Sequence, residues 1–274
     1  MTPCTPPCAP SHRHAAQRRS TLLVAFGMVY GAGLAHAQAP PPAPLAPLVS
    51  AAGERPGAPW RVVGFPAKQK PIPLTQFTIA TVDGQRALQL RTVASYGTLV
   101  HDWVGPAGTL HWRWRLDAHL AGGSAEPSLT TKEGDDAALK VCVMFDHALE
   151  QVPFVERTVL RLARSVSGEA LPAATLCYVW DTGSATRLQG ANPYTRRVRY
   201  MSLQTSASPL AQWTSESRDV ARDFAALFGD ELPGGASASA NAVPSVTAVV
   251  LGADSDNTGS RSLGWIAQVR WKAP

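Results

Sequence analysis

Two short acidic segments carry the residue types best suited to binding or acid–base chemistry. The run Asp254–Gly259 alternates side-chain oxygens around a glycine turn, as the first half of an EF-hand calcium loop does. The glutamate that completes such a loop at position twelve is replaced by Trp265. A calcium site would therefore borrow carboxylates from elsewhere, and the alternative is an Asx-type turn whose side chains bond their own backbone. The candidate metal ligands are Asp135, Asp136, Asp254, Asp256 and Asn257.

Aromatic residues are the second candidate feature. Exposed rings beside polar groups are a common way for sandwich domains to hold sugars, because a ring stacks on the apolar sugar face while polar groups bond the hydroxyls. Only rings that cluster at one rim would form such a site, since each ring alone is explained by packing. The candidate ligand-binding residues are Trp180, Asp181, Asn192, Tyr194 and Trp213.

Enzyme signatures are scarce, and the alternative function that we consider is polymer hydrolysis by a carboxylate pair. The sequence contains no G-x-S-x-G elbow, H-E-x-x-H, P-loop or Rossmann fingerprint. A glycosidase needs two carboxylates about 5 to 9 Å apart, and the spacing in the chain does not choose a pair. His147 and Glu150 read as a surface pair between a strand and a helix. The available acids are Glu126, Glu133, Asp135, Asp136, Asp181 and Glu216.

Alternating apolar residues predict the strands that must position these groups. Leu139, Val141, Val143 and Phe145 face one way, and Leu110–Leu116 repeats the pattern in what we expect to be a neighbouring strand. Short strands separated by Gly, Pro and Ser turns favour one all-β domain, an antiparallel jelly-roll-like β-sandwich with one or two peripheral helices. The predicted strands are Trp60–Phe65, Phe77–Val82, Arg86–Ala94, Thr98–Trp103, Thr109–Leu116, Ala138–Phe145, Ala174–Trp180, Val198–Gln204, Ser245–Leu251 and Leu263–Trp271.

Two helices are predicted. The first follows Pro153 and runs to about Val166, with valines and a leucine on one stripe and three arginines opposite. We expect its apolar stripe to pack on the domain and its charges to be solvated, although a basic amphipathic helix can also lie on an anionic membrane. The second covers Val220 to Phe228, with Ser217 as its cap and Gly229 at its end.

The N-terminal segment has the pattern of an export signal. Arg18 and Arg19 precede the apolar run Leu22–Leu34, and Ala35–Ala37 offers a small-x-small cleavage site. We expect residues 1–37 to be a signal peptide, residues 38–59 a Pro/Ala-rich linker, and residues 60–274 one domain. The apolar run is shorter than the roughly 20 residues of a spanning helix, so we expect a periplasmic or secreted protein with no transmembrane span in the mature chain.

Charge argues against nucleic acid as a partner. The whole chain has 25 lysines and arginines against 20 acidic residues. The expected leader removes three arginines and no acid, which lowers the basic count from 25 to 22 and leaves a net charge near +2. A chain of nearly balanced charge lacks the basic surface that nucleic-acid binding requires.

Two cysteines remain in the expected mature chain. Cys142 and Cys177 both lie in predicted strands. In an oxidising compartment they could form one disulfide, provided that the strands are close and the side chains share a face. The sequence leaves this open against two buried thiols.

The chain contains a series of motifs, in this order: Trp112-x-Trp114, Gly134-Asp135-Asp136, Tyr178-Val179-Trp180, Asn192-Pro193-Tyr194-Thr195, Trp213-x-x-Glu216-x-Arg218-Asp219-Val220-x-x-Asp223-Phe224 and Asp254-x-Asp256-Asn257-Thr258-Gly259. Together these motifs resemble a bacterial exported family that is catalogued only as a domain of unknown function. The resemblance covers roughly Trp60 to Trp271 and implies an exported single domain, with no activity or catalytic residue to transfer. The chain departs from the family pattern around Glu150–Leu171, where it carries an extra helix.

These observations favour a non-catalytic cell-envelope binding module for carbohydrate, with a polymer-degrading enzyme as the alternative and a structural partner-binding protein as a third class. In a sandwich, turns distant in sequence can meet at one rim. We therefore predict that the two acidic turns approach each other. Their carboxylates would then hold calcium, the one candidate cofactor, or pair with an arginine such as Arg218 or Arg261.

Overall fold

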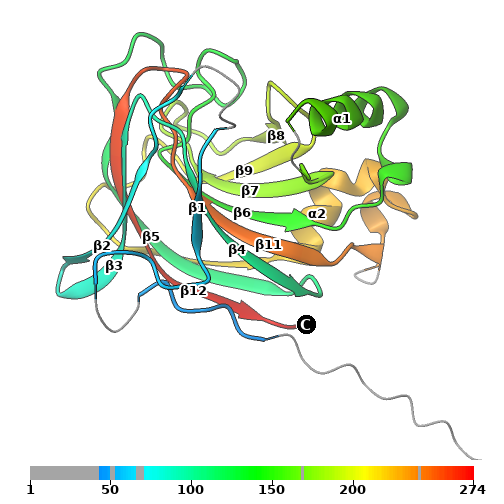
Figure 1. Cartoon of the computed structure of the whole chain (residues 1–274), viewed down its shortest axis with the longest axis horizontal. Coiled ribbons are helices and arrows are strands. Elements are labelled where there is room, and N and C mark those ends of the chain that lie inside the picture. Colours follow the sequence, from blue (N-terminus) through cyan, green and yellow to red (C-terminus); the bar gives the residue numbers. More distant parts are fainter. Residues whose placement is uncertain (1–42, 50–52, 66–70, 168–169, 240–241) are drawn as a thin grey trace, which may run out of the picture. The chain divides into compact units, whose positions relative to one another are not determined.

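Two β-sheets stacked face to face form the body of the protein (Figure 1). The computed structural model describes residues 43–49, 53–65, 71–167, 170–239 and 242–274. The expected all-β sandwich is confirmed, and so are all ten predicted strands to within a few residues at their ends. The expected signal peptide, residues 1–37, lies outside the described residues.

The larger sheet has seven strands. All neighbouring pairs are antiparallel except β7 and β9, which run parallel, so the expectation of a wholly antiparallel sandwich is wrong at this one pair. Its strands, in spatial order, are β1 (Arg61–Val63), β4 (Thr98–Gly105), β11 (Val246–Gly252), β6 (Leu139–Phe145), β7 (Ala174–Trp180), β9 (Val198–Gln204) and β8 (Gln189–Ala191).

The smaller sheet has five antiparallel strands. A turn at Asp83 and Gly84 joins two of them, and both residues have positive φ, as a tight hairpin requires. Its strands, in spatial order, are β10 (Thr214–Asp219), β5 (Thr109–Ala121), β12 (Arg261–Lys272), β3 (Gln85–Val93) and β2 (Gln76–Val82).

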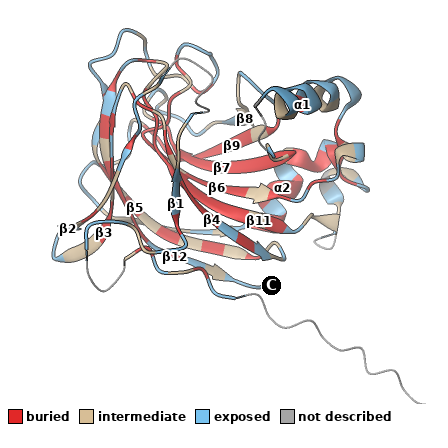
Figure 2. Cartoon of the chain, viewed as in Figure 1, coloured by how far each residue is buried: buried red, intermediate tan, exposed pale blue. Residues whose placement is uncertain are grey.

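The main core lies between the sheets and is rich in tryptophan. The prediction that strands β5 and β6 are neighbours in one sheet is wrong. They belong to opposite sheets and face each other across the core. Trp112 of β5 packs against Tyr178, and Trp114 packs against Trp180 with ring centroids 5.7 Å apart. Figure 2 shows the central strands of the larger sheet buried over most of their length. For β5 and β6, the alternation correctly predicted which residues face the core, but it did not predict that the two strands belong to different sheets.

A second apolar layer covers the outer face of the larger sheet, and the two cysteines lie in it. Cys142 of β6 is directly opposite Cys177 of β7, and the two form a disulfide. Val100, Val179 and Val250 belong to the same buried cluster. The bridge that the sequence left open is therefore present.

Helix α1 (Phe154–Ser167) and helix α2 (Val220–Phe228) lie at one end of the sheets, with the 3₁₀ turns Leu149–Gln151, Gly229–Glu231 and Gly235–Ser237 (Figure 1). Gly229 ends α2 as predicted, but Ser217 does not cap it. Ser217 lies within β10, and Asp219 instead accepts a hydrogen bond from the Arg222 backbone N–H at 3.0 Å.

The described part of the expected linker packs on the domain. Leu45 and Leu48 are buried in the main core, and the Trp103 indole N–H donates to the Ala43 carbonyl at 2.6 Å. His101 accepts from the backbone N–H of Ala46. Residues 43–49 are therefore not the free tether that their Pro/Ala composition predicted, because two leucines anchor them.

Candidate functional site

The two acidic turns meet, as predicted. Strands β6 and β11 are antiparallel partners, with Lys140 opposite Gly252, so the segment before β6 and the segment after β11 emerge side by side. The backbone N–H of Asp254 donates to the carbonyl of Ala137 at 3.1 Å, and the Ala137 N–H donates to the Asp254 carboxylate at 2.8 Å. Strand pairing thus joins segments about 120 residues apart.

Asp136 ties the two turns together. Its buried carboxylate accepts hydrogen bonds from the backbone N–H of Thr258 at 2.7 Å and of Asn257 at 3.3 Å, and from the Thr258 hydroxyl. Burial raises the pKa of Asp136, as does the charge of Asp254, while these bonds act to lower it. Because both carboxylate oxygens are engaged within the protein, Asp136 is chiefly a structural residue of the turn.

Lys140 is the cation of the cluster. Its ammonium pairs with the Asp254 carboxylate and lies 5.2 Å from the centroid of the Tyr96 ring. Burial alone would lower the pKa of Lys140, but Asp254 and Tyr96 more than offset this, and the pKa is raised. The predicted arginine partner is wrong for Arg218, which pairs with Asp223 at 2.7 Å instead.

Asp256 is the least satisfied carboxylate of the cluster. It lies with Asp136 and Asp254 so that one oxygen of each is within 4.8 Å of the others. Its Oδ1 atom is buried and has no hydrogen-bond partner among the described residues. Burial raises the pKa of Asp256 to about 6, with further contributions from the charges of Asp254 and Asp136.

Asp135 connects the cluster to a third segment, the turn between β8 and β9. Asn192 donates its side-chain N–H to the Asp135 carboxylate, while Asn257 donates to the Asp135 carbonyl at 3.0 Å. Burial raises the pKa of Asp135 to about 6 against the lowering effect of the Asn192 hydrogen bond. Two carboxyls, Asp135 and Asp256, therefore titrate close to neutral pH at this rim.

Tyr194 gives the rim an exposed aromatic ring. The side chain is 56% exposed, and its hydroxyl lies 2.9 Å from Asn257 Oδ1 and 3.0 Å from the Lys132 carbonyl. The backbone N–H of Tyr194 donates to Asn192 Oδ1 at 2.9 Å, and the Lys132 ammonium lies 5.4 Å from the ring centroid. Held at both the backbone and the hydroxyl, the ring presents a fixed apolar face beside carboxylates and amides.

The predicted ligand-binding residues divide into two that join this rim and three that do not. Asn192 and Tyr194 contact the predicted metal-binding residues directly, so the two candidate sets share one site. Trp180 is fully buried in the main core, and the expectation that it lies at the surface is wrong because the last residue of β7 still turns inward. Asp181 is buried, accepts from the Gly183 N–H, and has a pKa raised by burial.

Trp213 lies on a different surface. It packs beside Trp265 on the outer face of the smaller sheet, with the Arg113 guanidinium 5.2 Å from its ring centroid. Glu216, one of the acids considered for catalysis, accepts hydrogen bonds from Trp114 at 3.2 Å and Gln204 at 2.7 Å. Neither residue is bonded to the acidic rim in the described part of the chain.

The cluster offers oxygen ligands but already contains a cation. Calcium takes six to eight oxygens, and the turns provide three close carboxylates together with amide and carbonyl oxygens. The Lys140 ammonium neutralises Asp254, which reduces the need for a bound ion. Calcium binding here stays a prediction.

Sequence reasoning missed Lys140, and a signal for it existed. The strand Leu139–Phe145 is otherwise apolar on both faces, and Lys140 follows directly after the paired aspartates. A lone charge on such a strand needs a partner, and the paired acids next to it were the nearest candidates. His147, expected at the surface, is also buried and bonds Glu231 at 3.0 Å.

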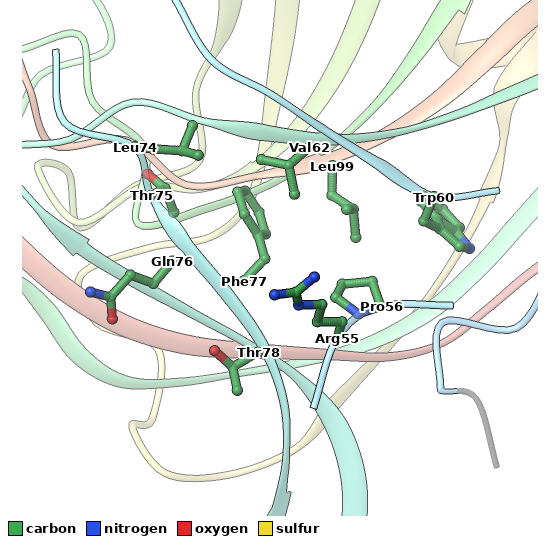
Figure 3. A pocket seen from close by; sticks show the side chains of 10 residues that line it. All are labelled: Arg55, Pro56, Trp60, Val62, Leu74, Thr75, Gln76, Phe77, Thr78 and Leu99. Atoms are coloured by element: carbon green, nitrogen blue, oxygen red, sulfur yellow. The ribbon is translucent and has the colours of Figure 1, made fainter. Parts of the chain in front are cut away.

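A separate hollow opens between the edge strands β1 and β2 (Figure 3). Its volume is about 660 Å³, and it is lined mainly by apolar side chains such as Trp60, Val62 and Phe77. The Arg55 guanidinium points into it toward Phe77. None of the rim carboxylates lines this hollow.

Comparison with known families identifies the domain. The family described as "Protein of unknown function (DUF3047)" matches residues 58–270. The chain belongs to the DUF3047 family. The match spans both sheets and all three segments of the rim, so the acidic site lies within the DUF3047 domain. No curated protein matches the chain.

Neither helix in the described part of the chain has the length and apolar character of a membrane-spanning helix.

Proposed function

We propose that this DUF3047 domain is an exported binding module for carbohydrate or another hydroxyl-rich polymer of the cell envelope. The observation that carries the proposal is Tyr194, an exposed ring held in place beside Asp135, Asn192 and Asn257. A fixed ring can stack on the apolar face of a sugar without losing conformational freedom on binding. The adjacent carboxylates and amides supply acceptors and donors for the hydroxyl groups.

The proposal includes export because the first 37 residues follow the signal-peptide pattern. The disulfide between Cys142 and Cys177 supports it, because such bridges persist in oxidising compartments. An envelope polymer would then be the ligand that the mature domain meets.

The test is binding of the chain from Gln38 onward to soluble envelope polysaccharides, measured by calorimetry or affinity electrophoresis. We expect Tyr194→Ala to weaken binding by about tenfold or more, equivalent to about 1.4 kcal/mol. Phe154→Ala is the matched control, because it removes another exposed ring from a different surface. Absence of binding across the panel, or unchanged binding by Tyr194→Ala, would contradict the proposal, and loss through Trp213→Ala alone would move the site to the smaller sheet.

A second candidate function is hydrolysis of such a polymer by the pair Asp135 and Asp256. The observation that favours it is that burial raises the pKa of both carboxyls to about 6, within the range of a general acid. Release of new reducing ends on incubation with the polymer would reveal it. Asp135→Asn and Asp256→Asn would then abolish cleavage while retaining binding, whereas a pure binding module shows no cleavage at all.

A further inference from the structure

Helix α1 is packed with its apolar stripe facing outward. Val155, Val159, Leu162 and Val166 follow the helical spacing i, i+4, i+7 and i+11, and each is between 62% and 71% exposed. Phe154, at the start of the helix, is 73% exposed. Figure 2 shows the outer surface of α1 as exposed. The expectation that this stripe packs on the domain is therefore wrong.

The inward side of α1 is held by polar contacts and one leucine. Leu160 packs against Val152 and Ala173, and the Arg164 guanidinium donates to the Leu171 carbonyl at 2.8 Å. Glu156 is bound by Arg197, and by Arg196 at 2.9 Å. These contacts fix the rotation of the helix, so the outward stripe is a built feature of the fold.

The charged side chains of α1 are mainly positive, and helical spacing places them on the side away from the stripe. The helix contains three arginines and one acid, and that acid, Glu156, is already paired inward. Arg161, next to Leu162, is exposed and forms no ion pair within the described residues. Arg157 lies over the Phe154 ring at 5.7 Å from its centroid. An outward apolar stripe on a helix whose polar side is basic, with Arg161 exposed, matches an anionic lipid surface.

We propose that α1 lies in the surface of an anionic phospholipid bilayer and anchors the domain there. The valines, Leu162 and Phe154 would enter the boundary between headgroups and acyl chains, while the long side chain of Arg161 would reach back to lipid phosphates. This proposal is independent of the rim at Tyr194. It places the domain on a membrane without a spanning helix.

The test uses the chain from Gln38 onward, because every core cluster of the described residues lies at or after Leu45 and the leader would itself bind lipid. Binding is measured by cosedimentation with vesicles of phosphatidylglycerol and phosphatidylcholine in equal amounts, and with phosphatidylcholine alone. We expect binding to the mixed vesicles that falls as salt is raised. Arg161→Glu should reduce it by more than about fivefold, the contribution of a single cation near an anionic surface.

Val159→Ser with Leu162→Ser removes apolar surface without touching the inward contacts and should weaken vesicle binding at least about tenfold. The matched control is Val93→Ser with Val104→Ser, which changes equally exposed valines on β3 and β4 and should bind as the unaltered protein does. Equal loss in the control pair, or no vesicle binding by the unaltered protein, would overturn the proposal. A concentration-dependent dimer that becomes a monomer in Val159→Ser with Leu162→Ser, without vesicle binding, would assign the stripe to a second copy of the chain instead.

Discussion

At the scale of single residues, the acidic rim depends on one lysine. Four aspartates crowd into two turns, and Lys140 is the cation that makes this arrangement stable. We expect Lys140→Met, which keeps much of the side-chain volume, to cost about 3 kcal/mol of unfolding free energy, because it leaves the Asp254 carboxylate buried without its ion-pair partner. Denaturant unfolding at pH 7 measures the loss. Lys272→Met, at an exposed lysine near the C-terminus, is the control and should change stability by less than about 0.5 kcal/mol.

The raised pKa of Asp256 predicts a pH dependence of opposite sign to an ordinary ion-paired acid. Because its pKa is about 6 in the folded protein and 3.8 ordinarily, the folded state holds a proton that the unfolded state releases between these values. Asp256 therefore costs stability as pH rises from about 4 through about 6. Asp256→Asn cannot ionise, so we expect it to raise the Tm at pH 8 and to leave it nearly unchanged at pH 3.5.

The pKa shift of Asp256, discounted for partial solvent screening, corresponds to about 1 kcal/mol of unfolding free energy. In a domain of this size that energy raises the Tm by about 2 to 4 °C, which is the rise we expect for Asp256→Asn. Asp146→Asn, at an exposed aspartate outside the rim, is the control. A Tm that falls at pH 8 would instead show that the Asp256 carboxylate is needed as a ligand or acceptor. Repeating the pair in millimolar calcium tests the metal prediction, because calcium bound to the native state alone raises the Tm with concentration.

The sequence predicted that the two acidic turns meet at the rim, but it did not predict which other residues join them there. The acidic turns met because strands β6 and β11 pair antiparallel, which the general rule about strand ends anticipated. Trp180 was misplaced because alternation does not show where a strand stops turning its side chains inward. Asp223 of helix α2 is buried, and its carboxylate is bonded by Tyr178 and Arg218. Such pairings join distant segments and leave no local pattern.

At the scale of elements, alternation found every strand that has an apolar face and missed the two that do not. Strand β10 is Thr214–Asp219, a wholly polar run at the edge of the smaller sheet. Strand β8 has three residues with a central glycine. Helix α1 was placed correctly along the chain but rotated wrongly. An apolar stripe normally faces a core, and here distant ion pairs decide the rotation instead.

The ion-pair network around Glu231 links α1 to the end of the larger sheet. Glu231 is buried and is bonded by Arg197, Arg199 and His147. Burial alone would raise the pKa of Glu231, but these partners lower it from 4.5 to about 2. The group therefore contributes stability that is fully present above pH 4.5 and is lost as pH falls toward 2.

We expect Glu231→Gln to reduce the unfolding free energy by about 3 kcal/mol at pH 7 and by much less at pH 2, where the carboxyl of the unaltered protein is half protonated. Urea unfolding across this pH range measures the difference. Glu150→Gln is the control, because Glu150 is exposed, and its unfolding free energy should show no such pH dependence. If the difference in unfolding free energy between Glu231→Gln and the unaltered protein stays the same from pH 7 to pH 2, the lowered pKa of Glu231 is contradicted.

At the scale of the whole molecule, the turn between β8 and β9 connects the two surfaces that we single out, because it carries Tyr194 at the rim and Arg196, which pairs with Glu156 of α1. The rim lies where β6 begins and β11 ends, while α1 follows the other end of β6 at Phe145. The two proposals rest on different residues, Tyr194 at the rim and the outward stripe of α1. The two proposals are therefore compatible, and Tyr194→Ala should leave vesicle binding unchanged just as Arg161→Glu should leave polysaccharide binding unchanged.

The proposed function requires the chain to leave the cytoplasm, and the N-terminus of the mature protein tests this directly. The first leucine anchored in the described core is Leu45, so cleavage after Ala37 would leave several residues between the new N-terminus and the folded domain. Intact mass of the protein recovered from the periplasm or medium should correspond to a start close to Gln38. Ala35→Arg with Ala37→Arg replaces both small residues of the cleavage site and should leave the precursor uncut at the membrane. A mature product that retains Leu22–Leu34 would show that the apolar run is an anchor, and vesicle binding through α1 would then be secondary to it.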